Sequence, residues 1–413
     1  MSTLKAVVKM TNKEAAIKII STLRQSGYQA LLAGGCVRDM LLARDAKDHD
    51  IATDAKPDDV MKLFRRTLAV GAKFGVVIVM LDSQQVEVAT FRTESGYADG
   101  RHPEKVAFSN AKEDASRRDF TVNGMFYDPL DDEIFDYVGG VDDIEAKVIR
   151  TIGDANERFG EDYLRMLRAV RFSAQLGFEI NSDTWNAICA NAEKITLISG
   201  ERISMEIESA LTCQNNSNAA NLLCESGLAR QIFEGFKGQT ADYGVDVLSA
   251  MPGGVSYMLA MGGLFAGVDT QFAMSKVELL MLSNRQVKQL AFLLENRGRL
   301  LQDNVSLADL KILLASGYFH ELFVLQRAID KVNGQDRDLL DRIEKRVNAI
   351  DQADISPKPL LNGNELLSMG VTPGPKVGKA LDGMYYAQLN EKLTNRSQAV
   401  EWVNKWLQEQ AEL

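Results

Sequence analysis

The spacing of apolar and polar residues changes character about a third of the way along the chain. Up to about residue 150, short β-branched runs are separated by polar turns, which is typical of a sheet with a few helices. Thr11 and Glu14 form a capping-box pattern that predicts a helix ended by Gly27. The pattern predicts strands at residues 28–35, 48–53, 75–81, 86–91, 134–138 and 147–152.

Beyond residue 153 the apolar positions recur with helical spacing. The clearest helical segments are 158–178, 203–211, 287–301, 338–350 and 397–410. The proline-containing stretch 355–360 interrupts this portion and predicts the start of a small terminal module. The fold class is therefore α+β, with a mixed head followed by an all-α remainder.

Composition narrows the class of protein. With 413 residues, 46% hydrophobic and 25% charged, the chain is long enough for two or more globular domains, and it has no apolar run long enough to cross a membrane. We find no secretory leader at the N-terminus, so we expect a cytoplasmic protein. A net charge of −10 argues against non-specific coating of nucleic acid and leaves room for a local basic cleft.

Cysteine and histidine are too sparse for a soft-ligand metal centre. The four cysteines show no CxxC spacing, and there are only three histidines. His49 beside Asp50 is a faint hint of a phosphohydrolase of the HD type, which needs further histidines. Any metal ion must therefore be bound by oxygen ligands.

Candidate chemistry begins with the stretch KDHDIAT at residues 47–53. If it is a strand, Asp48 and Asp50 project from the same face and repel each other when ionised. Glu87 projects from a neighbouring strand between two valines, and three carboxylates around one point suit Mg²⁺ held with substrate phosphates. The alternative is a solvated strand end.

A glycine pair and an arginine-rich run supply groups for a phosphate. Gly34 and Gly35 follow a strand and open a helix that carries Arg38, an arrangement that exposes backbone N–H groups, although a tight turn alone also needs glycine. In the run RRDFTVN at 117–123, Arg118 is suited to clamp a triphosphate. Asp119 and Asn123 have the acceptors and donors to hold a ribose hydroxyl. A surface ion-pair cluster is the alternative.

The segment ERFGEDYLRMLRAVRF at 157–172 is predicted to be one helix. Glu161, Arg165 and Arg168 then share a face. The carboxylate of Asp162 is able to accept a hydrogen bond from the amino group that cytosine and adenine both carry, while Arg165 donates to ring acceptors. The alternative is an ordinary helix with surface ion pairs.

Taken in order, these motifs resemble the class II tRNA nucleotidyltransferase and bacterial poly(A) polymerase family. They are GGCVRD, KDHDIAT, VEVATFR, RRDFTVN and EDYLRMLRAVRF, followed by ISGERISMEI at 198–207 and a similar tail from residue 360. Cys36 stands where the wider superfamily often has serine, and Tyr163 where proline or alanine is frequent.

The resemblance implies a polymerase-β-like nucleotidyltransferase head followed by helical neck, body and tail domains that bind tRNA. The expected ranges are 1–150, 151–215, 216–354 and 355–413. It implies catalysis by Asp48, Asp50 and Glu87, with Mg²⁺ on the two aspartates. The nucleotide-binding residues it implies are Gly35, Arg38, Arg118, Asp119, Asn123, Asp162, Arg165, Arg168 and Arg171. It also implies that Glu201 and Arg202 brace the neck.

The family contains several activities built on the same motifs. We expect addition of C, C and A to tRNA from CTP and ATP, with addition of A alone or general polyadenylation as alternatives. In this family a shortened loop is associated with enzymes that stop after CC, and the resemblance therefore disfavours such an enzyme here because the loop at 93–104 is intact. Lys376 and Lys379 at a helix start are placed to meet RNA phosphates. A non-catalytic RNA-binding protein on the same scaffold is the rival from another class. We expect no obligatory protein partner and no membrane.

Overall fold

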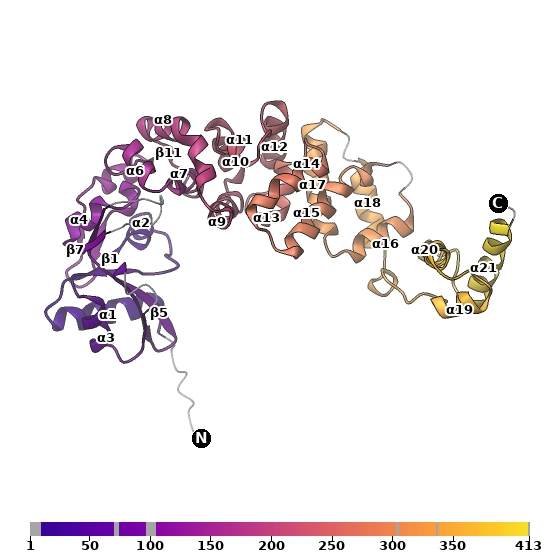
Figure 1. Ribbon diagram of the computed structural model, residues 1–413, viewed down its shortest axis with the longest axis horizontal. Helices are drawn as coiled ribbons and strands as arrows, with labels where there is room; N and C mark the ends of the chain where they lie inside the picture. The colour runs from indigo at the N-terminus through magenta and orange to yellow at the C-terminus, as the bar shows by residue number, and fades with distance from the viewer. Residues whose placement is uncertain (1–9, 70–73, 96–104, 303–304, 336–337, 412–413) are drawn as a thin grey trace, which may run out of the picture. The chain divides into compact units, whose positions relative to one another are not determined.

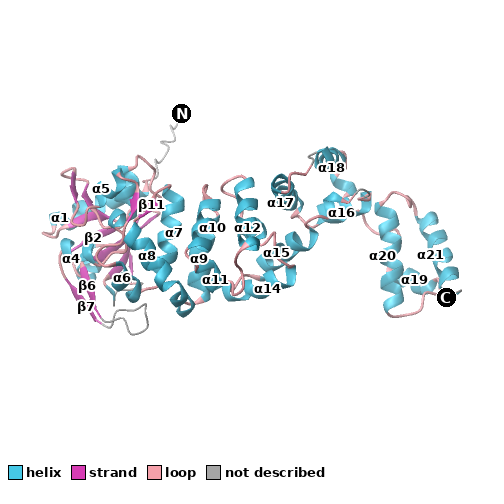
Figure 2. Ribbon diagram, turned by 90° about the horizontal axis from the view of Figure 1, so that it is seen from above, coloured by secondary structure: helices cyan, strands magenta, loops and turns pink. Residues whose placement is uncertain are grey.

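The computed structural model describes residues 10–69, 74–95, 105–302, 305–335 and 338–411. Its contacts divide the chain into two compact units. Unit 1 comprises residues 1–237 with 279–281, and unit 2 comprises 238–278 with 282–413. All described strands lie in unit 1, and the described part of unit 2 is helical (Figures 1 and 2).

A seven-stranded sheet organises the first part of unit 1. Its order is β3-β4-β5-β2-β1-β8-β9, and every neighbouring pair is antiparallel except β2 with β5. The strands are β1 (Ala30–Ala33), β2 (Ile51–Thr53), β3 (Thr67–Leu68), β4 (Val76–Leu81), β5 (Gln84–Thr90), β8 (Phe126–Asp128) and β9 (Glu133–Phe135). Two smaller sheets pair β6 (Arg92–Ser95) with β7 (Lys105–Phe108) and β10 (Val148–Ile149) with β11 (Glu179–Ile180).

Helices cover both faces of the large sheet. On one face lie α1 (Asn12–Gln25), which packs on β1 and β5, and α3 (Pro57–Leu63), which packs on β4 (Figure 1). Leu31 and Ala33 of β1 instead join a cluster with residues of α4 (Ala111–Ser116). Since side chains alternate along a strand, both faces of β1 are covered, and all four of its residues are buried.

The remaining helices of unit 1 pack mainly on one another. They are α2 (Gly35–Leu41), η2 (Thr121–Asn123), α5 (Gly140–Glu145), α6 (Ala155–Glu161), α7 (Leu164–Leu176), α8 (Ser182–Asn191), η3 (Ala192–Leu197), α9 (Gly200–Leu211), α10 (Asn216–Glu225) and α11 (Leu228–Ile232). Both α10 and α11 contact elements of unit 1, namely α7, α9 and η3. The expected boundary at residue 215 therefore falls inside unit 1.

Unit 2 has a helical core around α13, all eight of whose residues are buried. Its helices are α12 (Gln239–Ala250), α13 (Tyr257–Leu264), α14 (Thr270–Val277), α15 (Asn284–Asn296), α16 (Leu307–Ala315), α17 (Phe319–Val332), α18 (Asp338–Asn348), α19 (Gly363–Ser368), α20 (Pro375–Leu389) and α21 (Arg396–Ala411), with short 3₁₀ turns between some of them. The last three helices share a separate apolar cluster that includes Leu366, Met384 and Val403. This cluster fits the predicted terminal module.

Several predicted elements are confirmed and others differ. The capping box at Thr11 is present and Gly27 follows the end of α1 with φ +88°. The predicted strand at 48–53 is shorter, because β2 begins at Ile51. The predicted loop at 93–104 begins as strand β6, and its residues 96–104 lie outside the described ranges.

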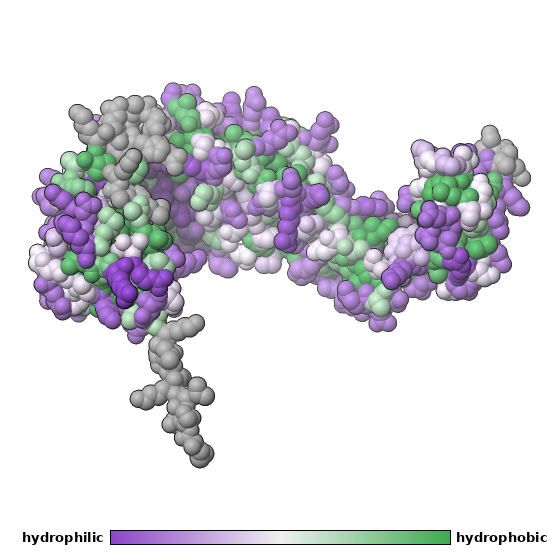
Figure 3. Space-filling model, turned by 60° about the horizontal axis from the view of Figure 1, so that its bottom comes forward, coloured by the Kyte–Doolittle hydropathy of each residue, from purple (hydrophilic) through white to green (hydrophobic). Residues whose placement is uncertain are grey.

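No helix in the described ranges has both the length and the apolar character needed to span a bilayer. Figure 3 shows hydrophilic side chains spread over the visible face of both units.

Candidate nucleotide-binding site

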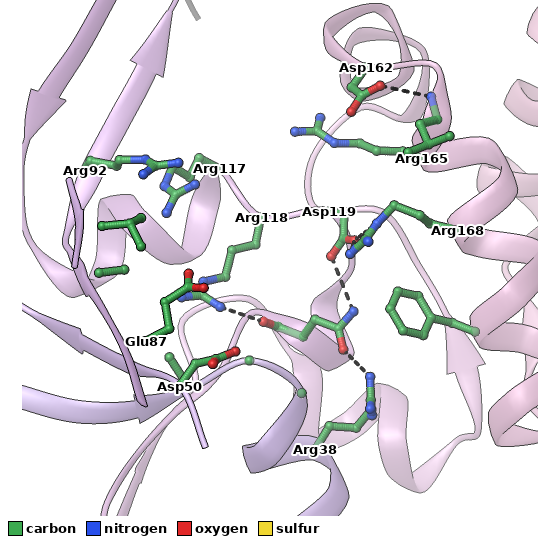
Figure 4. A pocket seen from close by; sticks show the side chains of 18 of the residues that line it. Arg38, Asp50, Glu87, Arg92, Arg117, Arg118, Asp119, Asp162, Arg165 and Arg168 are labelled. Carbon is green, nitrogen blue, oxygen red and sulfur yellow. Dashed lines mark hydrogen bonds and ion pairs between the residues drawn. The ribbon is translucent and has the colours of Figure 1, made fainter. Parts of the chain in front are cut away.

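A cavity of about 540 Å³ in unit 1 brings most of the predicted site residues together (Figure 4). It is bounded by β2, β4 and β5, by the β1–α2 turn, by the residues around η2, and by α7 and α9. Its charged lining residues are Arg38, Asp50, Glu87, Arg92, Arg117, Arg118, Asp119, Asp162, Arg165, Arg168 and Arg202. Seven of these are cationic and four are anionic, so the cavity suits a polyanion although the whole chain is acidic.

Asp50 and Glu87 form the acidic wall of this cavity. Strands β2 and β5 run parallel with Ile51 opposite Val88, so the residues just before them, Asp50 and Glu87, lie side by side. Desolvation raises the pKa of Asp50, and the charges of Glu87 and Asp48 raise it further, to about 6. The wall therefore carries an electrostatic cost that a bound cation would relieve.

Asp48 differs from the expectation. It lies with Asp50 in the extended segment before β2, and it is exposed and outside the cavity lining. Among the described residues no three His, Cys, Asp or Glu side chains come together as ligands for one ion. The expected convergence of three carboxylates is therefore not found, because the strand that was to align them starts three residues later.

Gly34 shapes the opposite wall. It precedes α2 with φ +76°, which favours glycine, and a Cβ there would lie 2.9 Å from Nη1 of Arg118. The guanidinium of Arg118 therefore lies directly over the glycine turn. It donates to the carbonyl of Asn123 and stacks over Phe126.

A buried aspartate orients two of the cavity arginines. Asp114 of α4 pairs with Arg117 at 2.7 Å and with Arg118 at 3.1 Å, and it also accepts from the backbone N–H of Arg92. Only 2% of its side chain is exposed. The sequence reasoning missed Asp114, although its i+3 and i+4 spacing to the two arginines was a usable signal.

Asp119 and Asn123 are engaged within the protein. Arg168 donates two hydrogen bonds to Oδ2 of Asp119, at 2.6 and 2.8 Å, while Arg38 donates to Oδ1 of Asn123 at 2.6 Å. Burial on its own raises the pKa of Asp119, but Arg168, aided by the Phe120 amide, brings it down to about 2. Both residues line the cavity, and much of their hydrogen-bonding capacity orients its arginines.

The predicted single helix at 157–172 is two helices. Asp162 has extended backbone angles (φ −155°, ψ 103°) and separates α6 from α7. Its Oδ2 accepts from Arg202 of α9 at 2.6 Å, and its Oδ1 accepts from the amide of Leu164. The break turns Asp162 toward the cavity (Figure 4).

The predicted pairing of Glu161 with Arg165 survives this break, at 2.5 Å. Arg158 of α6 also pairs with Glu161, at 2.6 Å, and donates to the carbonyl of Arg118 at 2.7 Å. Glu161 therefore links the two helices that flank Asp162.

Arg171 is the predicted nucleotide-binding residue that does not line the cavity. It pairs with Glu206 of α9 at 2.7 Å and lies over the ring of Phe172, 4.2 Å from the centroid. Phe172 lines the cavity, and Arg38 and Arg168 also lie over its ring, both at 5.3 Å. Arg171 thus contacts the cavity-lining ring of Phe172 without lining the cavity itself.

The comparisons with known proteins agree with this geometry. A family model described as "Poly A polymerase head domain" matches residues 30–150, and one described as "Probable RNA and SrmB- binding site of polymerase A" matches residues 177–239. A CCA-adding enzyme from Bacillus pumilus is 35% identical over 95% of this chain and 96% of its own length. The chain belongs to the CCA-adding enzyme family.

Further relatives in this family extend the likeness. A CCA-adding enzyme from Lactobacillus johnsonii is 32% identical over 94% of this chain and 95% of its own. The solved structure of the Bacillus stearothermophilus CCA-adding enzyme in complex with CTP is 28% identical, covers 98% of this chain and all of its own, and superposes with a TM-score of 0.78.

Four cavity residues with charged or aromatic side chains were not predicted as site residues of this family member. They are Arg92, Arg117, Phe172 and Arg202. Arg202 was expected only to brace the neck with Glu201. All four lie inside or next to the quoted motifs, but their direction depends on how α4, α7 and α9 pack, which motif spacing does not report.

The donor set fits a hard cation. Carboxylate oxygens are the protein ligands that Mg²⁺ prefers, and it commonly uses one or two of them together with substrate phosphates. Asp50 and Glu87 are exposed to the cavity, and Asp48 is close enough to affect the pKa of Asp50. Cys36 is excluded as a ligand of this kind, because burial and the charge of Asp50 raise the pKa of its thiol to about 11.

Proposed function

We propose that this protein adds C, C and A to the 3′ end of tRNA, using CTP and ATP and releasing pyrophosphate. The observation that carries the proposal is the cavity itself, in which two adjacent carboxylates face seven arginines. Membership of the CCA-adding enzyme family supports the substrates, and the bound CTP of the Bacillus stearothermophilus enzyme supports a nucleotide in this fold.

We assign the reacting centre to the acidic wall. Mg²⁺ bound there would supply charge neutralisation for the nucleotide and a lowered pKa for the attacking 3′-hydroxyl. Asp50 and Asp48 are the proposed ligands, and Glu87 is placed to join them or to take the hydroxyl proton. Gly35, Arg38 and Arg118 then bind the triphosphate in line with the hydroxyl.

We assign base selection to the junction of α6 and α7. Each oxygen of Asp162 has two lone pairs, so after accepting from Arg202 and Leu164 the carboxylate still accepts from the amino group of cytosine or adenine. Arg165 uses Nη1 for Glu161 and the carbonyl of Arg158, and its guanidinium has further donors for ring acceptors. Uracil and guanine present a carbonyl where the amino group should be.

The helical portion is assigned to tRNA binding. The match of the head-domain family model up to residue 150 supports the head at 1–150, and the separate apolar cluster supports a tail within 355–413. Lys376 and Lys379 are exposed in the first turns of α20, where RNA phosphates are able to reach them. The neck and body ranges and the cytoplasmic location stay predictions, the last of which cell fractionation would test.

The decisive experiment supplies each nucleoside triphosphate separately to tRNAs that end before C, after CC and after CCA. We expect C to be added to the first, A to the second and nothing to the third. Growth beyond CCA would instead indicate a poly(A) polymerase, and A addition only after CC would indicate an A-adding enzyme. tRNA binding without pyrophosphate release would indicate the non-catalytic scaffold.

Asp50→Ala tests the reacting centre directly. We expect it to abolish pyrophosphate release, because Asp50 belongs to the acidic wall of the cavity. tRNA binding should stay intact, because it is assigned to the helical portion of the chain. Full turnover by this variant would refute the assignment. Asp131→Ala is the matched control, since that exposed aspartate lies outside the cavity and pairs only at the surface with Arg24.

A further inference from the structure

Two arginines of the cavity stand at its two functional ends. Figure 4 shows Arg165 beside Asp162, where base selection is assigned, and Arg118 near Glu87, where the triphosphate and the reacting centre are assigned. A nucleotide that contacts both ends must span the separation between these two arginines. Whatever fixes that separation therefore decides where the α-phosphate lies when the base is bound.

One side chain, that of Arg158 in α6, joins the supports of both arginines. Its Nη2 donates to the carbonyls of Arg117 and Arg118, the latter at 2.7 Å. Its Nη1 pairs with Glu161 at 2.6 Å, and Glu161 in turn pairs with Arg165 at 2.5 Å. Arg165 also donates to the carbonyl of Arg158 at 2.7 Å. The backbone at the triphosphate end and the guanidinium at the base end are therefore connected through a single residue.

The chemistry of this connection makes it firm. Arg117 caps the C-terminus of α4, and the carbonyl dipoles at a helix C-terminus favour a cation. A guanidinium is planar and presents its donors in a fixed fork, so it holds the two carbonyls and the carboxylate in one geometry. Only 11% of the Arg158 side chain is exposed, so water competes little for these hydrogen bonds.

We propose that Arg158 is a positioning residue that sets the separation between Arg165 and Arg118, so that recognition of the base brings the α-phosphate to the acidic wall. The inference rests on the proposed function, because the roles of the two arginines come from it. With Arg158 in place, a nucleotide that satisfies Asp162 and Arg165 is already in register with the triphosphate site. Without Arg158 the two ends move independently, and the cost of ordering them is added to binding and reaction.

Arg158→Lys tests the proposal, because it keeps the charge and removes the fork that holds the carbonyls and Glu161 together. The acceptor is a tRNA that ends before C, and kcat and KM are measured for CTP and for UTP. We expect kcat/KM for CTP to fall about 100-fold, since a small misplacement of reacting groups has effects of this size. UTP lacks the hydrogen bond to Asp162 that depends on the register, so the preference for CTP over UTP should weaken about tenfold.

The two halves of the nucleotide separate positioning from local damage. Tripolyphosphate and cytidine are tested as competitive inhibitors against CTP in wild type and in Arg158→Lys. Each half uses one end of the cavity, so its inhibition constant should be the same in both proteins. The dissociation constant of CTP should rise about tenfold, because CTP alone has to align both ends.

Two further variants complete the design. Arg158→Gln is shorter and uncharged, and it should give the same pattern if Arg158→Lys does not fold, as a melting curve will show. Arg150→Lys is the matched control, because this arginine of unit 1 pairs with Asp143 at 3.0 Å and lies outside the cavity lining. It should leave the constants for CTP and UTP unchanged.

The outcomes distinguish this proposal from the proposed function. Equal losses for CTP and UTP, weaker inhibition by either half alone, or wild-type constants in the Arg158 variants would overturn the positioning role, while addition of C and A by the wild type would still support the enzyme. Conversely, full turnover by Asp50→Ala would refute the reacting centre without changing the inhibition constants of the two halves. A weaker preference for CTP together with unchanged binding of both halves supports the positioning role.

Discussion

Replacing Asp119 with asparagine removes the charge at the centre of the arginine network and preserves the shape of the side chain. Asp119 is 9% exposed and accepts two hydrogen bonds from Arg168 and one from the Phe120 amide. Its pKa falls from 3.8 to about 2 in the folded protein. At 1.36 kcal/mol per pKa unit, the carboxylate contributes about 2 kcal/mol to the stability of unit 1 at neutral pH.

The sign of the pH dependence follows from the lowered pKa. Above the unfolded value the stabilisation is complete, and it is lost as the pH falls through the folded value. The free energies of unfolding of wild type and Asp119→Asn should therefore differ by about 2 kcal/mol at pH 7, by roughly half of that at pH 3, and by little at pH 2. The variant itself should show a flatter pH profile in this range.

Urea unfolding followed by tryptophan fluorescence measures this difference. Trp185 lies in unit 1 and Trp402 and Trp406 lie in unit 2, so a background with Phe at the latter two positions reports unit 1 alone. The free energy in water comes from linear extrapolation. An Asp119→Asn protein within about 0.5 kcal/mol of wild type at pH 7 would refute the reasoning and indicate that desolvation cancels the ion pair.

The surface pair of Arg24 and Asp131 supplies the matched control. Their distance is 2.9 Å, but 59% of the Asp131 side chain is exposed. Surface pairs contribute between zero and about 1 kcal/mol. Asp131→Asn should therefore change the unfolding free energy by much less than Asp119→Asn.

Three other predictions follow from the structure. Asp50→Asn should raise the melting temperature of the metal-free protein at pH 7 to 8 while abolishing activity, because neighbouring carboxylates and desolvation raise the pKa of Asp50 to about 6 and so disfavour its charged form. Gly34→Ala should raise the KM for CTP and ATP, since its Cβ would displace the guanidinium of Arg118. Glu391→Ala should destabilise unit 2 by about 1–3 kcal/mol, measured by urea unfolding, because it leaves the buried ammonium of Lys311 without this partner.

Each of these has its own control. The stabilisation by Asp50→Asn should vanish below about pH 3, where the wild-type carboxyl is protonated in both the folded and the unfolded state, and a gain that persists there would contradict the explanation. Gly27→Ala is the control for Gly34→Ala, because Gly27 has a similar positive φ (+88° against +76°) and its added Cβ would have no atom within 4 Å. It should therefore lower the stability without changing the KM for nucleotides. Lys311→Met should lower the unfolding free energy of unit 2 by less than Glu391→Ala does, because it removes the buried charge itself. Equal decreases in the two variants would show that the unpaired charge is not the cause.

Local sequence signals determined the elements that depend only on neighbouring residues. The capping box at Thr11, the helix opened by Gly34 and the strands predicted at 75–81 and 86–91 are all confirmed, the last two as β4 and β5. These features depend on caps, glycine conformations and period-two alternation, which act over a few residues. The ordered motifs also sufficed to assign the family and the mixed head.

Tertiary structure decided where the charged side chains point. The continuous helical pattern at 157–172 gave no sign of the break at Asp162, whose carboxylate pairs with Arg202 of α9, 40 residues further along the chain. Likewise, the sequence pattern predicted a strand that would hold Asp48 and Asp50 on one face. In the structure the pairing with β1 and β5 begins only at Ile51.

Sequence by itself therefore determined which residue types are available for nucleotide chemistry and which fold carries them. Only the folded structure decided which of them line the cavity, because ion pairs such as Asp119 with Arg168 and Asp162 with Arg202 join residues that are far apart in the sequence. Burial strengthens such pairs, and burial is a property of the whole fold.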